Sequence, residues 1–387
     1  MAILKLRPLA VLVALLWCWP VSAEDRQTKL RDLVRAIAAG SYITVEQLLD
    51  EGLDPNTADE NGTTPLMASA AFNRLGIAKL LLERGADPSA ARKDGRSALI
   101  VAARGDLAEI ITLLLKNGAD AGRTDRKGWS ALHYAAKGRS AAPAGLLLEA
   151  GADPDAGKGA ADATPLILAA GSINDSGLEI MAELLGRGAR PDAVAKDGWS
   201  PLMSAVKRNK PKRIILLLDA GADVNLQAAD GRNALSEAAR AGRLGQVRSL
   251  LERGAQADGG DLQGVTPLTS AVLAKSREVV EFLVERGARV SRAGKDGKTP
   301  LILAASLGET DLAKFLLDSG ADVNQRNETD GTTALMWAAN TGATETVKML
   351  LAAGARADLE AKDGWDAVEA ARSAGHEDIA KLLARDI

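Results

Sequence analysis

A unit of about 33 residues recurs along nearly the whole of this 387-residue chain. Each copy has a turn position, a helix start two or three positions later, and a Leu-rich helix that ends in glycine. The turn positions are Gly62, Gly95, Gly128, Asp162, Gly198, Gly231, Gly264, Gly297, Gly331 and Gly364. Their spacing hardly varies and is widest between Asp162 and Gly198. A near-constant period of this size predicts a solenoid, in which each copy buries its apolar face only against its neighbours.

Each copy is predicted to contain two helices. In the copy at 62–85, Thr64 is placed to cap a helix N-terminus, and Pro65 stands at the first helical position, where its missing N–H has no cost. Gly85 ends the second helix. A capping residue stands at this place in all ten copies: Thr64, Ser97, Ser130, Thr164, Ser200, Asn233, Thr266, Thr299, Thr333 and Asp366. Small residues dominate the first helix and leucines the second, so we expect the stack to curve with the first helices on its concave side.

Three stretches resemble ankyrin repeats: Asp-Gly-Lys-Thr-Pro-Leu-Ile-Leu-Ala-Ala at 296–305, Gly-Ala-Asp-Val-Asn at 320–324 and Ser-Ala-Leu-His-Tyr-Ala-Ala at 130–136. The resemblance covers about 24–387. It implies an all-α repeat solenoid of stacked helix–turn–helix units, with a β-hairpin finger at each turn that joins two units. The histidine typical of the family is kept only at His133, for which a packing role is predicted.

The period and the resemblance together predict about eleven helix pairs. We expect an N-terminal cap pair at 24–58, nine repeats at 59–361 and a C-terminal cap repeat at 362–387. In the last copy Glu369 and Arg372 replace core residues, as the outer face of a terminal unit requires.

The segment 1–23 lies outside the repeat and has the layout of a secretory signal. Lys5 and Arg7 precede an apolar run at 9–19, which is too short to span a membrane comfortably, and small residues end the segment at Ala23. We expect cleavage after Ala23 and export to the periplasm or the secreted space, with no stable membrane insertion afterwards; the alternative is a retained anchor. Cleavage would change the formal net charge from −3 to −5, because Lys5 and Arg7 are lost. It would also remove Cys18, the only cysteine, so that no disulfide could form.

The remaining chain offers little that could support catalysis. Its two histidines are His133 and His376, and the second is expected to be exposed in the inter-helix turn of the last copy. There is no Cys/His cluster for zinc, no glycine-rich phosphate loop after a strand, and no histidine free to act as a base. We therefore predict no enzymatic activity, no cofactor and no metal. The acidic net charge argues against nucleic-acid binding.

Basic residues recur in the turn that follows the first helix and are predicted to line one edge of the concave side. This basic track comprises Arg104, Lys137, Arg139, Lys207, Arg208, Lys210, Arg240, Arg243 and Lys275. The segment 207–213 alone holds five positive charges. In an acidic chain, this local concentration is suited to an acidic partner. The alternative is a solvated face that contributes only to solubility.

Tryptophan is a second departure from the repeat. Trp129, Trp199 and Trp365 each directly follow the turn glycine, at a finger position that the family leaves variable and exposed. Exposed tryptophan is enriched at binding hot spots. The alternative is stacking of each ring on the neighbouring finger.

A third departure is the irregular copy at 159–195. It has Asp162 in place of the turn glycine and three extra positions within 171–177. Inserted loops in solenoids often lie on the binding face. The alternative is a surface insertion that the fold tolerates.

These features favour a non-catalytic, monomeric scaffold that binds a partner protein, possibly acidic, on its concave face and finger tips. A second hypothesis uses the same basic track to bind anionic ligands such as lipid headgroups or polyanions. A third is a secreted effector directed at a host, because ankyrin repeats are frequent among such proteins.

Overall fold

The computed structural model describes residues 23–157 and 163–384. The chain divides into two compact blocks, the N-terminal block Met1–Ala161 and the C-terminal block Asp162–Ile387. The predicted signal segment, apart from Ala23, and the irregular turn position Asp162 lie outside the described residues.

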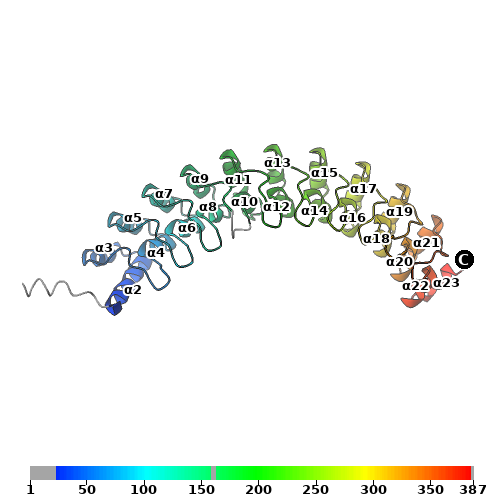
Figure 1. Ribbon diagram of the computed structural model, residues 1–387, viewed down its shortest axis with the longest axis horizontal. Coiled ribbons are helices and arrows are strands. Elements are labelled where there is room, and N and C mark those ends of the chain that lie inside the picture. The colour runs from blue at the N-terminus through cyan, green and yellow to red at the C-terminus, as the bar shows by residue number, and fades with distance from the viewer. Residues whose placement is uncertain (1–22, 158–162, 385–387) are drawn as a thin grey trace, which may run out of the picture. The chain divides into compact units, whose positions relative to one another are not determined.

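The described residues contain 22 helices, α2 to α23, which form eleven consecutive pairs as predicted (Figure 1). The N-terminal block holds α2 (Ala23–Ala39), α3 (Tyr42–Asp50), α4 (Pro65–Ala71), α5 (Leu75–Glu83), α6 (Ala98–Arg104), α7 (Ala108–Lys116), α8 (Ala131–Ala135) and α9 (Ala142–Glu149). The C-terminal block holds α10 (Pro165–Ala170), α11 (Gly177–Gly186), α12 (Pro201–Lys207), α13 (Pro211–Asp219), α14 (Ala234–Arg240), α15 (Leu244–Glu252), α16 (Pro267–Leu273), α17 (Arg277–Glu285), α18 (Pro300–Ser306), α19 (Thr310–Asp318), α20 (Ala334–Asn340), α21 (Thr344–Ala352), α22 (Ala367–Ser373) and α23 (Glu377–Leu383).

Within each block the helices form two rows (Figure 1). First helices pack on first helices, α4 on α6 on α8 in the N-terminal block, and α10 through α22 in the same way in the C-terminal block. Buried alanine pairs such as Ala102-Ala103 and Ala304-Ala305 allow this close approach. Buried leucines of the second helices, such as Leu114 and Leu250, fill the space behind them. In the C-terminal block the first helices follow the concave side, as the small residues predict (Figure 1).

The predicted caps stand at the start of every repeat's first helix. In nine of the ten, the cap side chain accepts a hydrogen bond of 2.8 to 3.4 Å from the backbone N–H three residues later. The exception is Ser130, whose hydroxyl lies 2.9 Å from Nδ1 of the buried His133. His133 also accepts a hydrogen bond from the backbone N–H of Ser130, which confirms its predicted packing role. The second helices end on glycine with φ between +83° and +93° in all ten cases.

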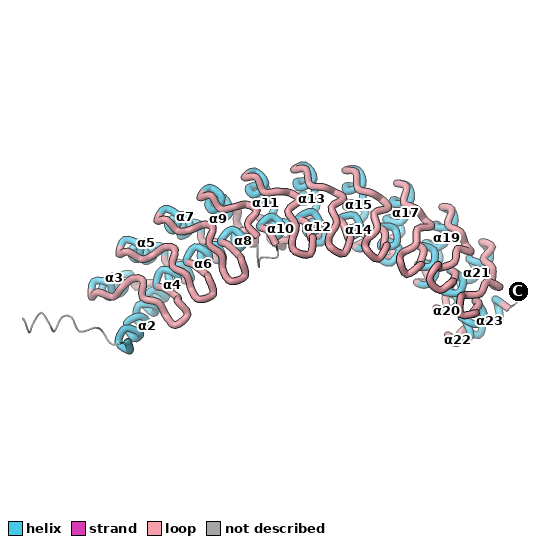
Figure 2. Tube along the Cα trace, in the orientation of Figure 1, coloured by secondary structure: helices cyan, strands magenta, loops and turns pink. Residues whose placement is uncertain are grey.

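The fingers, which join one helix pair to the next, project beside the row of first helices (Figure 2). The expectation of β-hairpins at these positions is wrong in one respect, because the fingers are turns rather than paired strands. The described residues contain only two isolated antiparallel bridges, Ala91 with Ser97 and Thr124 with Ser130. The physical reason is length: a finger holds only two short-range backbone hydrogen bonds, such as Arg92 N–H to Arg96 C=O and Gly95 N–H to Arg92 C=O, both at 2.9 Å. The next residue already caps a helix.

Neighbouring fingers stack backbone against backbone. Leu262 N–H donates to the carbonyl of Asp230 in the preceding finger at 3.0 Å. Gly231, with φ of +82°, permits this approach, since a Cβ at that position would lie 2.5 Å from Leu262 N. The turn glycines therefore serve both the local turn and the spacing between repeats.

Candidate functional site

Three positions of the repeat meet on the side of the fingers and first helices: the residue before the cap, and the fourth and seventh residues after it. In the N-terminal block these are Trp129, Tyr134 and Lys137, around the cap Ser130. The Trp129 ring contacts Tyr134 edge-on, with centroids 5.2 Å apart, and stacks on His133 at 5.9 Å. Lys137 Nζ lies 5.4 Å from the indole centroid. The structure thus brings together a tryptophan and a basic residue that the sequence placed in separate features.

Hydrogen bonds fix this finger to its helix. Tyr134 Oη donates to Asp125 Oδ2 at 2.7 Å. Asp125 Oδ1 accepts the backbone N–H of Lys127 at 2.8 Å and of Trp129 at 3.0 Å. Burial acts to raise the pKa of Asp125, but these hydrogen bonds bring it below its ordinary value. The carboxylate is therefore held ionised, and the finger backbone is tied down close to Trp129.

The C-terminal block repeats the tryptophan–cation arrangement at Trp199. Lys207 Nζ lies 5.2 Å from the indole centroid, and the guanidinium of Arg232 lies 5.4 Å from it. Lys207 ends the first helix of the same repeat, whereas Arg232 comes from the next finger. Trp199 is half-buried between them, so both the expected exposure and the expected contact with a neighbouring finger are partly met.

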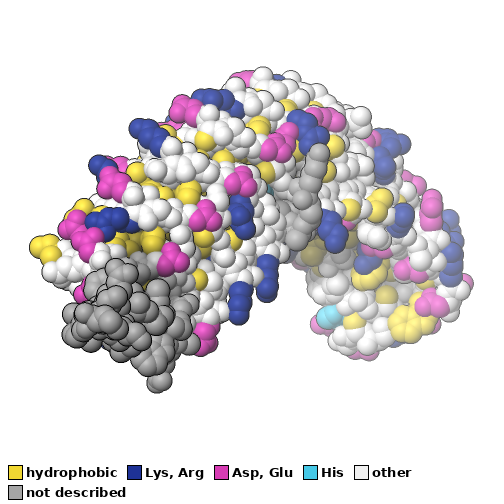
Figure 3. Space-filling view, turned by 60° about the vertical axis from the view of Figure 1, so that its left-hand side comes forward, with side chains coloured by type: hydrophobic (Ala, Val, Ile, Leu, Met, Phe, Trp, Pro, Cys, Tyr) yellow, Lys and Arg dark blue, Asp and Glu magenta, His cyan; other side chains and the backbone are white. Residues whose placement is uncertain are grey.

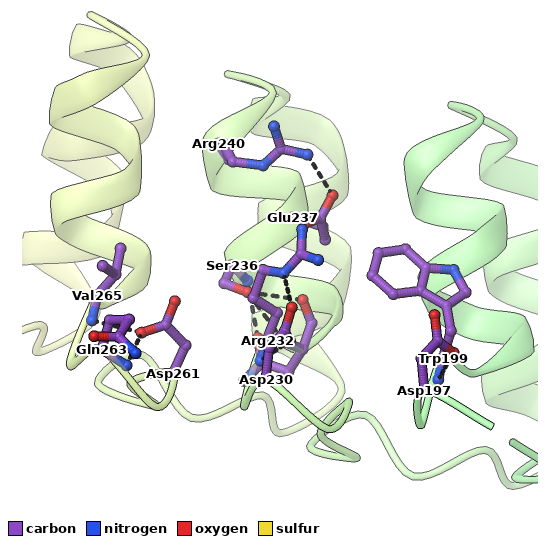
Figure 4. A network of polar contacts seen from close by, with 11 residues as sticks. Asp197, Trp199, Asp230, Arg232, Ser236, Glu237, Arg240, Asp261, Gln263 and Val265 are labelled. Atoms are coloured by element: carbon purple, nitrogen blue, oxygen red, sulfur yellow. Dashed lines mark hydrogen bonds and ion pairs between the residues drawn. The ribbon is translucent and has the colours of Figure 1, made fainter. Parts of the chain in front are cut away.

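Arg232 is held in place by carboxylates (Figure 4). Its Nε donates to Asp230 Oδ2 at 2.7 Å, and its Nη1 donates to Glu237 Oε1 at 2.8 Å. The hydrogen bond to Asp230 raises the pKa of Arg232 above its ordinary value, although partial burial opposes this. Glu237 is buried and also accepts Arg240 Nη2 at 2.7 Å. Arg240, a member of the basic track, is therefore paired within its own repeat.

A cavity of about 700 Å³ opens beside Trp199. Its described lining is Ala163, Ile167, Ala195, Lys196, Asp197, Trp199, Lys207 and Arg232. Three basic side chains and one acidic side chain stand in this set. The cavity thus joins an indole wall to three basic side chains, of which Arg232 is already paired with Asp230 and Glu237.

Comparison with known protein families gives an independent assignment. The model of a family described as ankyrin repeats (3 copies) matches residues 33–125, 85–158, 102–192, 166–261, 202–294, 247–327 and 320–387. The chain belongs to the ankyrin-repeat family. Ankyrin repeats are generally protein–protein interaction modules, and the family is typically non-catalytic. A search of curated proteins gave no match.

The rest of the basic track on these ankyrin repeats divides into paired and unpaired side chains. Arg243 Nη1 donates to the carbonyl of Val206 at 2.5 Å, at the end of the preceding repeat's first helix. Lys210 pairs with Asp175 at 3.6 Å and Lys275 with Glu309 at 2.7 Å. Three members are exposed and form no ion pair with any described residue: Arg104, Arg139 and Arg208. Basic and acidic side chains lie interspersed over the face seen in Figure 3. The track is therefore not an unbroken row of free charges.

Arg213 is not part of the charged surface, which corrects the interpretation of the 207–213 segment. Its side chain is only 2% exposed. Nη1 donates to the carbonyls of Ala169 at 3.1 Å, Ala170 at 3.2 Å and Ser172 at 2.5 Å, and Nη2 donates to the carbonyl of Asn174. Burial lowers the pKa of Arg213 below its ordinary value. The guanidinium thus anchors the loop that enlarges the preceding ankyrin repeat.

Trp365 is the exposed member of the three finger tryptophans, at 47% of its surface. It lines a cavity of about 170 Å³ together with Trp337. Trp337 is half-buried: its Nε1 donates to Thr332 Oγ1 at 3.0 Å, and Lys298 Nζ lies 4.3 Å from its centroid.

No group of three or more His, Cys, Asp or Glu side chains in the described part of the chain is arranged to hold a metal ion. Likewise, none of the helices described combines the length and the apolar character needed to span a bilayer.

Proposed function

We propose that this ankyrin-repeat protein is a non-catalytic, monomeric scaffold of the periplasm or secreted space that binds an acidic segment of a partner protein. The contact is made on the fingers and first helices of the C-terminal block, at the cavity beside Trp199. A carboxylate of the partner pairs with Lys207 or Arg232, and an apolar group packs on the indole.

The observation that supports this proposal is the composition of that cavity. It combines Trp199 with Lys196, Lys207 and Arg232, and Asp197 is the only acidic side chain in its described lining. Tryptophan and arginine are the residue types enriched at interface hot spots. Arg232 is already fixed by Asp230 and Glu237, so little side-chain ordering remains to oppose binding.

The test is capture of the partner from the envelope fraction of the source organism, using the chain from residue 24 onward as bait. Lys207→Glu is expected to reduce capture of the main partner at least about tenfold, because it reverses a charge inside the cavity. Arg208→Glu is the matched control, since it makes the same charge change at the next residue, outside the described lining. Equal capture by the two variants would place the contact elsewhere.

Binding of anionic ligands is the alternative that the same cations allow. Retention on heparin or on vesicles with anionic lipid, lost as salt is raised, would favour it when it is sensitive to Lys207→Glu. No retention at low salt, together with capture of a protein, would exclude the binding of anionic ligands.

A further inference from the structure

Three side chains surround the guanidinium of Arg232: the indole of Trp199 and the carboxylates of Asp230 and Glu237. Arg232 lies against Trp199 of the preceding repeat while it pairs with Asp230 and Glu237 (Figure 4). A planar guanidinium is suited to such a site, because it can stack on an aromatic face while its N–H groups bind carboxylates in the ring plane.

The cavity between Trp337 and Trp365 keeps part of this arrangement without the guanidinium, and Ala370 stands there at the position of Glu237. Asp363 stands three residues before its cap, Asp366, just as Asp230 stands three residues before Asn233. As Trp199 does, Trp337 supplies an indole from the preceding repeat, although from its first helix α20 rather than from its finger. At the position of Arg232, the residue before the cap, the last repeat has Trp365. An indole and an aspartate are kept, and a second indole replaces the arginine.

The charge of the cavity lining and the exposure of Trp365 indicate that the group suited to this cavity is a cation. Asp363 and Asp366 are among the nine described residues that line the cavity, and no Lys or Arg is among them. Of the four tryptophans in the described part of the chain, Trp129, Trp199 and Trp337 each have a Lys or Arg of this chain over the ring. Trp365 has none among the described residues.

We propose that this cavity binds an arginine side chain of a partner protein. The guanidinium stacks on Trp365 and pairs with the carboxylate of Asp363, with Trp337 forming another part of the cavity wall. A volume of about 170 Å³ admits one side chain rather than an element of secondary structure. The proposal rests on the proposed function as a protein-binding scaffold and adds a second contact, opposite in charge to the cavity beside Trp199.

The test uses three peptides, acetyl-Gly-Gly-X-Gly-Gly-amide, in which X is arginine, citrulline or leucine. Citrulline has the shape of arginine without its charge. Each peptide is titrated into the ¹⁵N-labelled protein, and the indole N–H signals of Trp337 and Trp365 are followed by NMR. We expect the arginine peptide to shift both signals with millimolar affinity, and the other two to bind on the order of tenfold more weakly.

Matched variants separate charge from folding. Asp363→Asn keeps an acceptor for the backbone N–H of Trp365, which Asp363 now accepts at 3.2 Å. Asp366→Ser keeps a helix cap of the kind found at Ser200. Each should weaken binding of the arginine peptide severalfold. Asp318→Asn removes an exposed charge at the end of α19, outside the cavity, and should leave binding unchanged.

Two results would overturn the proposal. Equal binding of the leucine and arginine peptides would make the cavity an apolar socket, and no indole shift with the arginine peptide in large excess would mean that it takes no such side chain. These outcomes are independent of the proposed function, which fails if Lys207→Glu and Arg208→Glu capture the partner equally. Neither of those variants alters the Trp337–Trp365 cavity.

Discussion

At the scale of single residues, two basic side chains six positions apart have opposite environments. Lys207 lies over an indole at the surface, whereas Arg213 is buried. Helical register explains the difference, because Arg213 occupies the place at which adjacent repeats bury Ile180 and Gln246. Charge density alone suggested one exposed cluster at 207–213. Alignment on the repeat period was the signal that could have identified the buried arginine.

We predict that Arg213→Ile lowers the free energy of unfolding by about 2–4 kcal/mol, because charge-assisted hydrogen bonds are lost and buried carbonyls are left without a donor. Isoleucine is a suitable replacement in volume, since Ile180 fills the equivalent place in the preceding repeat. Chemical denaturation measures the change. The neighbouring exposed Lys212→Ala is the control and should change stability by less than about 0.5 kcal/mol. If both variants were equally stable, the anchoring role of Arg213 would be wrong.

At the scale of the helix and the finger, the ends of helices were easier to predict from the sequence than the contacts on the surfaces of the fingers. A cap depends on one side chain and the backbone of the same turn, so Thr64 could be placed from local sequence. The finger faces depend on neighbouring repeats. Arg232 and Glu237 were missed as partners of Trp199 and Arg240, although Arg232 stands at the same repeat position as the finger tryptophans.

Comparison of Gly231 with Gly254 distinguishes the need for a left-handed turn from the need for close contact between repeats. Gly231 and Gly254 have φ of +82° and +88°, but only at Gly231 would a Cβ meet the next finger, 2.5 Å from Leu262 N. At Gly254 nothing lies within 4 Å. We expect Gly254→Ala to cost about 1 kcal/mol from the left-handed conformation, and Gly231→Ala to cost at least about 2 kcal/mol because the fingers must also separate. Thermal and urea unfolding of the two variants give the comparison, and equal costs would contradict the stacking explanation.

At the scale of the whole molecule, the chain consists of two compact blocks. Stability in a repeat protein is approximately a sum of terms for each repeat and each nearest-neighbour contact, so a chain of this length need not unfold in one step. The tryptophans report on the blocks separately. Trp129 lies in the N-terminal block, and Trp199, Trp337 and Trp365 lie in the C-terminal block.

We predict that urea unfolding of the chain from residue 24 onward shows two transitions by tryptophan fluorescence. In the Trp129→Phe variant, tryptophan fluorescence should show only the transition of the C-terminal block. Leu250→Ala, which removes a fully buried side chain of that block, should shift this transition by about 2–5 kcal/mol, while Leu114→Ala should shift only the other. A single transition moved equally by both leucine variants would show that the blocks unfold together.

The sequence by itself determined the period, the eleven helix pairs, the caps and the glycine ends, because each depends on chemistry within one turn of the chain or on spacing that repeats. The tertiary structure decided which side chains meet. It placed Lys207 and Arg232 on Trp199, buried Arg213 under the enlarged loop, paired Arg240 with Glu237 and put Trp337 beside Trp365. Apart from the Arg240–Glu237 pair, which lies within one helical turn, these contacts join positions in different turns or in successive repeats. Their energy therefore depends on packing distances that the order of residues does not contain.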